Sequence, residues 1–307
     1  MSSRLPKGLG PCKPHPEHSN TFVDKNNQLT TSAWIVVTDN EPDIDLRSRI
    51  CLPRRICFSV AKPVSPIAEA ALCTASCAFT IGGKLYLITG AVLATTSTTF
   101  GVSWMGAEWR GDGPSAAVPT DTRLSIKKSI RLGRVACYDT NVAWAIIEVA
   151  DTFEACRDRR CRDCATFVNN CWDTENQRGS VPVDLIAMKK PARRNGEPNL
   201  LSRHSFRLRC AADNRETAGF RHVSWHKGAM PSSGGSDRLN PIDSGSLVMY
   251  NGQDIGIATA VEPDRSQITV LLFNYKLWAF IGDYLGVSPE DGPVVVYRTL
   301  RHLELAT

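Results

Sequence analysis

The sequence predicts an all-β protein of two β-barrels or sandwiches, and three observations support this prediction. Many short β-prone runs, each bounded by Gly, Pro, Asn or Asp, fall into two blocks along the chain. A Gly-Gly pair and an Asn-Gly pair join neighbouring runs in the manner of tight hairpins. A helical spacing of apolar residues occurs only near the C-terminal end.

Length and composition are those of an ordinary globular protein. The 307 residues suffice for two domains or one large one, with 42% hydrophobic and 22% charged residues. The 36 basic and 31 acidic residues give a formal charge of +5, which is mild. Basic residues gather at 127–134 and 189–194, where we expect solvated surfaces, so nucleic acid is not an expected partner.

The sequence lacks signals for export and for membrane insertion. The first 20 residues contain no apolar core of the kind that a signal peptide needs. Lys84 interrupts the best candidate for a membrane-spanning run. We therefore expect a soluble cytoplasmic protein without membrane contact, in which most of the eleven cysteines are free thiols, buried small hydrophobes or metal ligands rather than disulfides.

The first half of the chain is divided by its composition. Residues 1–65 carry scattered Pro, Asn, Asp and Arg and predict an irregular N-terminal arm with one or two strands. Residues 66–150 predict the first β-barrel. In it, runs 76–81 and 84–89 flank Gly82-Gly83 and form a hairpin, and 98–104 and 143–149 are further strands.

The second half begins with a polar, cysteine-rich connector at residues 151–180. Residues 181–286 predict the second β-barrel with a C-terminal helix, and residues 287–307 a short tail. The expected strands are 182–188, 205–210, 220–226, 246–250, 254–260 and 267–273. The helix is expected at 275–286 because apolar residues recur at spacings of three and four, namely Leu277, Phe280, Ile281, Tyr284 and Leu285.

The stretch LNPIDSGSLVMY, residues 239–250, places Ser244 in a turn of the kind that exposes a nucleophile. Together with two barrels and a closing helix, this turn resembles the chymotrypsin-like (trypsin-fold) serine proteases over residues 70–286. In texture the chain is similar to intracellular trypsin-like domains of filamentous fungi. The resemblance implies two antiparallel β-barrels of chymotrypsin type and places Ser244 at the nucleophile's position.

The same resemblance shows that the nucleophile's partners are replaced. Where the family has its general-base histidine, after KLYLITGA, this chain has Val92. Where the family has the aspartate that orients the base, before WAII, it has Ala143, although a shifted register would offer Asn141 or Asp139. Ile242 stands at the position of the oxyanion-hole glycine, whose conformation a β-branched residue adopts poorly.

None of the six histidines lies in the predicted first barrel, from which the family's base comes. His222 and His226 fall on one face of a second-barrel strand and are the only candidates for a substitute base. Loss of the base alone lowers turnover on the order of 10⁶-fold, or about 8 kcal/mol of barrier. Losing an oxyanion donor adds about 3 kcal/mol.

The sequence therefore predicts a pseudoprotease that works by binding a protein or peptide, with Ser244 as a remnant held in its turn by local hydrogen bonds. One alternative is an active serine hydrolase that takes its base from His222 or His226. Another is a zinc-stabilised scaffold that binds nucleic acid. The cluster Cys156, Cys161, Cys164 and Cys171 has the thiols for one tetrahedral Zn²⁺, but its C-x4-C-x2-C-x6-C spacing departs from the paired CxxC pattern, and no cofactor is expected.

Overall fold

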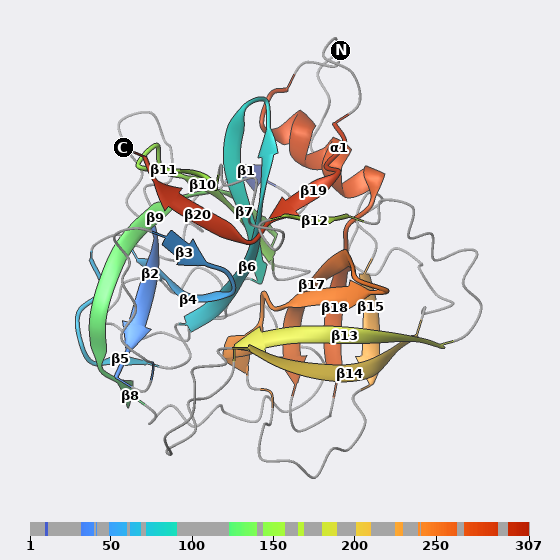
Figure 1. Ribbon diagram of the computed structural model, residues 1–307, viewed down its shortest axis with the longest axis horizontal. Helices are drawn as coiled ribbons and strands as arrows, with labels where there is room; N and C mark the ends of the chain where they lie inside the picture. Colours follow the sequence, from blue (N-terminus) through green and yellow to red (C-terminus); the bar gives the residue numbers. More distant parts are fainter. Residues whose placement is uncertain are drawn as a thin grey trace.

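The computed structural model describes residues 10–11, 32–39, 41, 49–59, 62–68, 72–90, 123–139, 144–156, 165–168, 180–188, 201–209, 225–229, 239, 241–262, 267–287 and 294–306. The predicted fold class is confirmed, because these residues form two antiparallel β-barrels of chymotrypsin type with a helix near the C-terminal end (Figure 1). The predicted strand at 98–104 lies outside the described residues.

The first barrel is a ring of six strands in the order β6-β4-β2-β9-β10-β7, closed by the pairing of β7 with β6. Their bounds are Ser32–Thr38 (β2), Arg54–Ser59 (β4), Leu72–Ile81 (β6), Lys84–Gly90 (β7), Ile126–Asp139 (β9) and Trp144–Val149 (β10). Each strand contributes to a fully buried apolar interior. Gly82 and Gly83 have φ angles of 56° and 76°, as a tight hairpin turn requires, so the predicted hairpin is confirmed.

The second barrel is closed in the order β13-β14-β15-β18-β17-β16. Its strands are Ser180–Met188 (β13), Leu201–Arg209 (β14), Trp225–Ala229 (β15), Leu247–Tyr250 (β16), Gln253–Glu262 (β17) and Gln267–Leu272 (β18). Asn251 and Gly252, at φ angles of 48° and 77°, turn the chain from β16 to β17 as the Asn-Gly pair predicts. A separate apolar cluster fills this barrel.

The predicted boundary of the first barrel at residue 66 is wrong. Strands β2 and β4 lie upstream of residue 66, inside the segment predicted as an irregular arm. Both are strands of the first barrel. The signal of β4 is hidden because it begins with Arg54-Arg55, which sequence reasoning assigns to the surface but which are only 3% and 5% exposed. A two-residue strand β1, Gly10–Pro11, pairs with β9.

The C-terminal residues are also more ordered than a tail. Strand β19, Arg298–Leu300, lies between β6 and β12, Ala165–Phe167. Strand β20, His302–Leu305, lies between β3, Arg49–Cys51, and β11, Phe153–Ala155. Parts of the predicted connector and tail therefore pair with each other against the first barrel. A further short pair joins β5, Ile67–Ala68, to β8, Arg123–Leu124.

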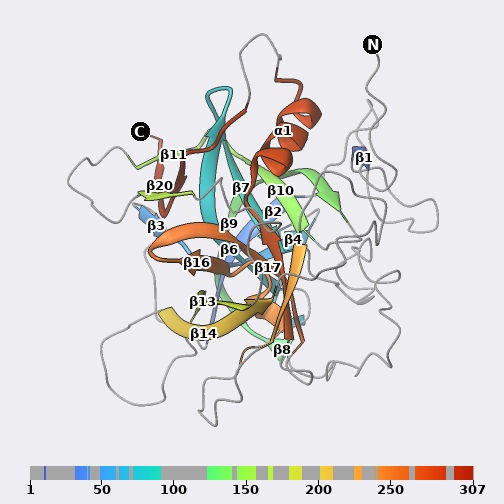
Figure 2. The ribbon, with the colours of Figure 1, turned by 90° about the vertical axis from the view of Figure 1, so that its right-hand side faces the viewer.

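The helix α1, Tyr275–Tyr284, lies beside the β6–β7 hairpin in both views (Figures 1 and 2). It begins after Asn274, whose side-chain oxygen accepts a hydrogen bond from the Leu277 N–H at 2.9 Å, a typical N-cap. Leu277 and Ile281 are buried as predicted, Leu285 is half-buried, and the side chains of Phe280 and Tyr284 lie outside the description. Trp278, which was not predicted, packs on Phe79 and Phe273 from the two barrels, with ring centroids 5.1 and 5.2 Å away.

Candidate functional site

Ser244 lies in a tight turn between a 3₁₀ helix, Pro241–Asp243, and strand β16. The Ser246 N–H donates to the Asp243 carbonyl at 2.9 Å, and the Gly245 N–H donates to the Ala258 carbonyl of β17 at 2.5 Å. Gly245 has a φ of 93°, which residues with a Cβ rarely adopt. Contrary to the exposed turn expected from the sequence, Ser244 is only 6% exposed.

Strand β6 of the first barrel holds this turn from the other side. The Thr74 N–H donates to the Ser244 carbonyl at 2.8 Å, and the Ser76 hydroxyl donates to the Gly245 carbonyl at 2.5 Å. The approach is so close that a Cβ on Gly245 would lie 1.7 Å from the Thr74 carbonyl oxygen. The turn is therefore clamped between the two barrels and leaves no room for a side chain at position 245.

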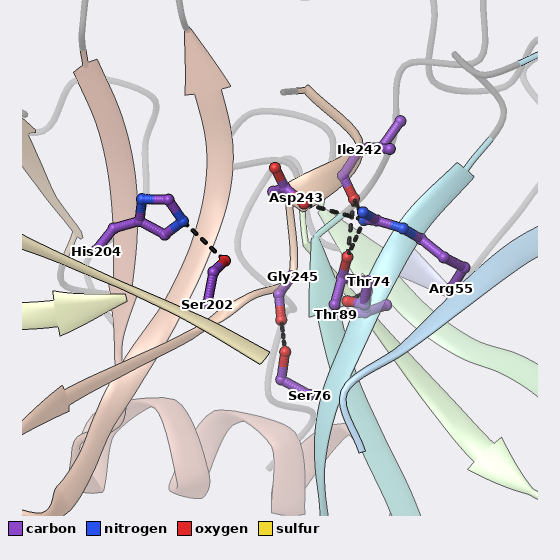
Figure 3. A network of polar contacts seen from close by, with 9 residues as sticks. All are labelled: Arg55, Thr74, Ser76, Thr89, Ser202, His204, Ile242, Asp243 and Gly245. Carbon is purple, nitrogen blue, oxygen red and sulfur yellow. Dashed lines mark hydrogen bonds and ion pairs between the residues drawn. The ribbon is translucent and has the colours of Figure 1, made fainter. Parts of the chain in front are cut away.

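A buried arginine from the first barrel reinforces the clamp (Figure 3). Nη1 of Arg55 donates to the Thr74 hydroxyl and to the Ile242 carbonyl, both at 2.8 Å, and lies 3.1 Å from Oδ1 of Asp243. The Thr74 hydroxyl donates to the same Ile242 carbonyl at 2.8 Å. The sequence predicted local hydrogen bonds for this turn, but its charged partner comes from a distant strand.

Ile242, predicted at the oxyanion-glycine position, has a structural role in packing. It is 7% exposed and joins an apolar cluster with Val36 and Cys57 of the first barrel and with Ile67 of β5. Its carbonyl oxygen accepts the two hydrogen bonds from Arg55 and Thr74. Both its side chain and its carbonyl therefore attach the turn to the first barrel.

Val92 and Ala143, the predicted positions of the missing base and acid, lie outside the described residues, so their placement stays a prediction. The structure does describe Gly90 and Trp144, which lie close to these two positions in the sequence. Gly90, the last residue of β7, pairs with Trp144, the first residue of β10. A Cβ on Gly90 would meet Cβ of Ser244 at 2.9 Å. The strand ends that lead to the two predicted positions thus meet beside Ser244.

No described histidine is hydrogen-bonded to the Ser244 hydroxyl. His204 on β14 instead lies 2.9 Å, through Nε2, from the hydroxyl of Ser202 on the same strand (Figure 3). The backbone of His226 pairs with Val270 in β15–β18, and nothing describes its side chain. His222 lies outside the described residues, so a role for either proposed substitute base is untested.

Of the cysteine cluster, only Cys156 is described, and it lies half-buried directly after β11. Cys161, Cys164 and Cys171 lie outside the described residues, and the zinc site stays a prediction. Within the described ranges no three His, Cys, Asp or Glu side chains are grouped as metal ligands would be. Cys73 and Cys77 are buried in the core, and burial raises the pKa of Cys73 to about 12.

A second buried ion pair near the turn escaped the sequence analysis. Nη2 of Arg301 lies 2.5 Å from Oδ1 of Asp254, which is fully buried at the start of β17, and the Thr299 hydroxyl donates to Oδ2. Burial raises the pKa of Asp254, while Arg301 and Thr299 oppose the rise. Nη1 of Arg301 also donates to the Ser76 carbonyl at 3.4 Å. The only signal in the sequence was an acidic residue at the edge of an apolar strand.

Comparison with known proteins adds little beyond the fold. No family model matches the chain, and no curated protein matches it. Among solved structures, the chain is similar to a glutamic acid-specific serine protease, at 12% identity and a TM-score of 0.31, covering 67% of this chain and 89% of that chain. A likeness this low carries no argument about activity, and the assignment of the fold rests on the two closed rings of strands.

Among the described residues, no helix is long and apolar enough to cross a membrane.

Proposed function

We propose that the protein is a catalytically inactive relative of the chymotrypsin-like serine proteases that works by binding a protein or peptide. One observation carries the proposal: hydrogen bonds and a buried ion pair connect the turn that contains Ser244 to the first barrel. Its carbonyls accept hydrogen bonds from Thr74 and Ser76, and its carboxylate is paired with Arg55. A serine that is 6% exposed has little access to an acyl group of a substrate.

The chemistry of acyl transfer supports the same conclusion. A serine hydroxyl attacks a carbonyl only when a base accepts its proton, and the described part of the chain supplies none in hydrogen-bond contact with Ser244. At the positions predicted for the family's base and acid, Val92 and Ala143 have side chains that can neither accept a proton nor orient a base. Loss of the base alone would lower turnover on the order of 10⁶-fold.

Binding is the function that such a scaffold retains. The resemblance to the proteases implies an inter-barrel surface on which an extended peptide could lie, and the arms outside the barrels offer further surface. We propose a protein or peptide partner, in keeping with the sequence prediction. Zinc at the cysteine cluster would stiffen the connector but is not required for this role.

A fluorophosphonate probe combined with a peptide library tests the proposal. The probe labels serines that are activated by a base, so we expect no labelling of the purified protein under conditions that label trypsin fully. When the protein is incubated with an immobilised peptide library, mass spectrometry should find retained peptides that are intact. Ser244→Ala should leave the retained set and the melting temperature nearly unchanged.

Stoichiometric labelling that is lost in Ser244→Ala would show an active hydrolase and overturn the proposal. In that case His222→Ala and His226→Ala identify the base, since the essential one would abolish labelling. If the protein retained no peptide from the library above background, the proposed binding function would also be contradicted.

A further inference from the structure

Arg54 is a buried cation that the Ser244 site does not use. It begins β4 and is 3% exposed, and within the described part of the chain its Nε and Nη1 have no hydrogen-bond partner. Buried guanidinium groups are almost always paired, because an unpaired one loses its hydration without compensation. An unpaired arginine in a folded protein therefore calls for an explanation.

The position of Arg54 explains why Arg55 cannot share its role. Side chains alternate along a strand, so Arg54 lies on the same face as Ile56 and Phe58, which belong to the apolar interior of the first barrel. Arg55 lies on the opposite face, towards Asp243. Arg54 therefore lies at one end of the barrel interior, while Arg55 pairs with Asp243 between the two barrels.

The end of the barrel at which Arg54 lies also carries the charged residues Lys127, Glu41 and Asp39. The last residue of β2, Thr38, pairs with the first residue of β9, Ile126, and β4 begins at the same end because it runs antiparallel to β2. Lys127 is exposed there, with its ammonium donating to the Glu41 carbonyl oxygen at 3.1 Å. The charges of Arg55, Arg54 and Lys127 all act on the carboxylate of Glu41, and Arg55 is in turn paired with Asp243.

Glu41 does not satisfy Arg54. Its carboxylate accepts a long hydrogen bond of 3.4 Å from the Thr38 N–H, and it makes no hydrogen bond to the Arg54 guanidinium among the described contacts. Burial raises the pKa of Glu41 and lowers the pKa of Arg54, although charges nearby oppose both shifts. Both shifts reflect groups that burial destabilises in their charged forms.

We propose that Arg54 is the anchor of an anion-binding site at this end of the first barrel, taking a small tetrahedral oxyanion such as phosphate. Arg54 forms its floor and supplies two nitrogen atoms, Nε and Nη1, whose N–H groups have no partner among the described residues, and the exposed Lys127 lies at its rim. Guanidinium groups bind phosphate with charge-assisted hydrogen bonds. A bound anion would supply both the missing acceptors and the missing negative charge.

Thermal unfolding of the full-length protein tests this proposal. Phosphate is titrated against sodium chloride at matched ionic strength, and phenyl phosphate serves as a second ligand. We expect saturable stabilisation by phosphate of about 3 °C at tenfold excess over the dissociation constant. Stabilisation by phenyl phosphate would show that the site also takes the phosphoryl group of a larger molecule, and its absence would restrict the site to the free ion.

Arg54→Met is the decisive variant, since it removes the donors and keeps an unbranched apolar chain. It should abolish the shift caused by phosphate, and in phosphate-free buffer it should melt no lower than the parent. Arg203→Met, which removes an exposed arginine on β14, is the matched control and should keep the shift. If Arg54→Met fails to fold, Arg54→Lys should fold and bind phosphate at least about tenfold more weakly.

Two results would overturn the proposal. One is the absence of any saturable shift by phosphate in the parent protein at matched ionic strength. The other is an equal shift in the parent and in the Arg54 variant, which would indicate the general stabilising action of phosphate on exposed surface.

Discussion

Arg55 of the first barrel and Asp243 of the second form a buried ion pair, with Nη1 3.1 Å from Oδ1 and with side chains 7% and 5% exposed. The pair joins β4 to the residue that precedes Ser244. The same Nη1 also fixes the Ile242 carbonyl, so one guanidinium group holds both the backbone and the side chain of the turn.

Removal of Arg55 should strongly destabilise the protein. Arg55→Met leaves the Asp243 carboxylate buried without its cation, and we expect a loss of about 3–5 kcal/mol in the free energy of unfolding, measured by urea denaturation. Arg134→Met removes an exposed arginine from its pair with Glu148 and should lose less than about 1 kcal/mol. Equal losses in the two variants would show that the buried pair does not secure the turn.

Gly245 should tolerate no side chain, unlike a glycine of similar backbone conformation elsewhere. Gly245→Ala places a Cβ 1.7 Å from the Thr74 carbonyl oxygen and should lose more than about 3 kcal/mol of stability. Gly252→Ala meets no atom within 4 Å and should lose only the backbone strain of its φ of 77°, about 1–2 kcal/mol. Melting temperatures of both variants check the difference, and a Gly245 variant as stable as the Gly252 variant contradicts the clamp.

Glu148 should stabilise the protein in a manner that depends on pH. Burial tends to raise its pKa, but hydrogen bonds and charges from Arg134 and Lys84 outweigh burial and lower the pKa below the ordinary value of 4.5. A lowered pKa adds stability above the ordinary value and loses it as pH falls through the folded-state value. The parent should therefore have a higher melting temperature than Glu148→Gln at neutral pH. This difference should disappear below pH 4.5. If the difference in melting temperature did not depend on pH, the contribution of Glu148 would come from packing and not from its charge.

A repaired triad tests whether the proposed loss of catalysis is confined to the three predicted positions. Val92→His, Ala143→Asp and Ile242→Gly together should give weak reactivity of Ser244 towards an activated ester. The variant should also be less stable, because Ile242→Gly removes a buried side chain that packs against the first barrel, at a cost of about 3 kcal/mol or more. An inert serine in a folded variant would show that the clamped turn itself prevents catalysis.

Sequence patterns predicted much of the fold because the patterns are local. The Gly82-Gly83 hairpin, the Asn251-Gly252 turn and the buried face of α1 depend on residues within a few positions of one another. The arm was predicted to hold one or two strands, but not to contribute β2 and β4 to the first barrel, because closing that barrel depends on the pairing of β2 with β9, which lies far along the chain. The strand character of Arg54–Ser59 is visible only once the ring of six strands is closed.

For the candidate site, the sequence by itself determined a serine in an Asp-Ser-Gly turn and predicted non-catalytic residues at the three partner positions. Only the tertiary structure decided that Asp243 is paired with Arg55, that Asp254 is paired with Arg301 and that Arg54 is left unpaired. The physical reason is that the energy of a charged group depends on its burial and on partners brought together by folding. Neither quantity is a property of the neighbouring sequence.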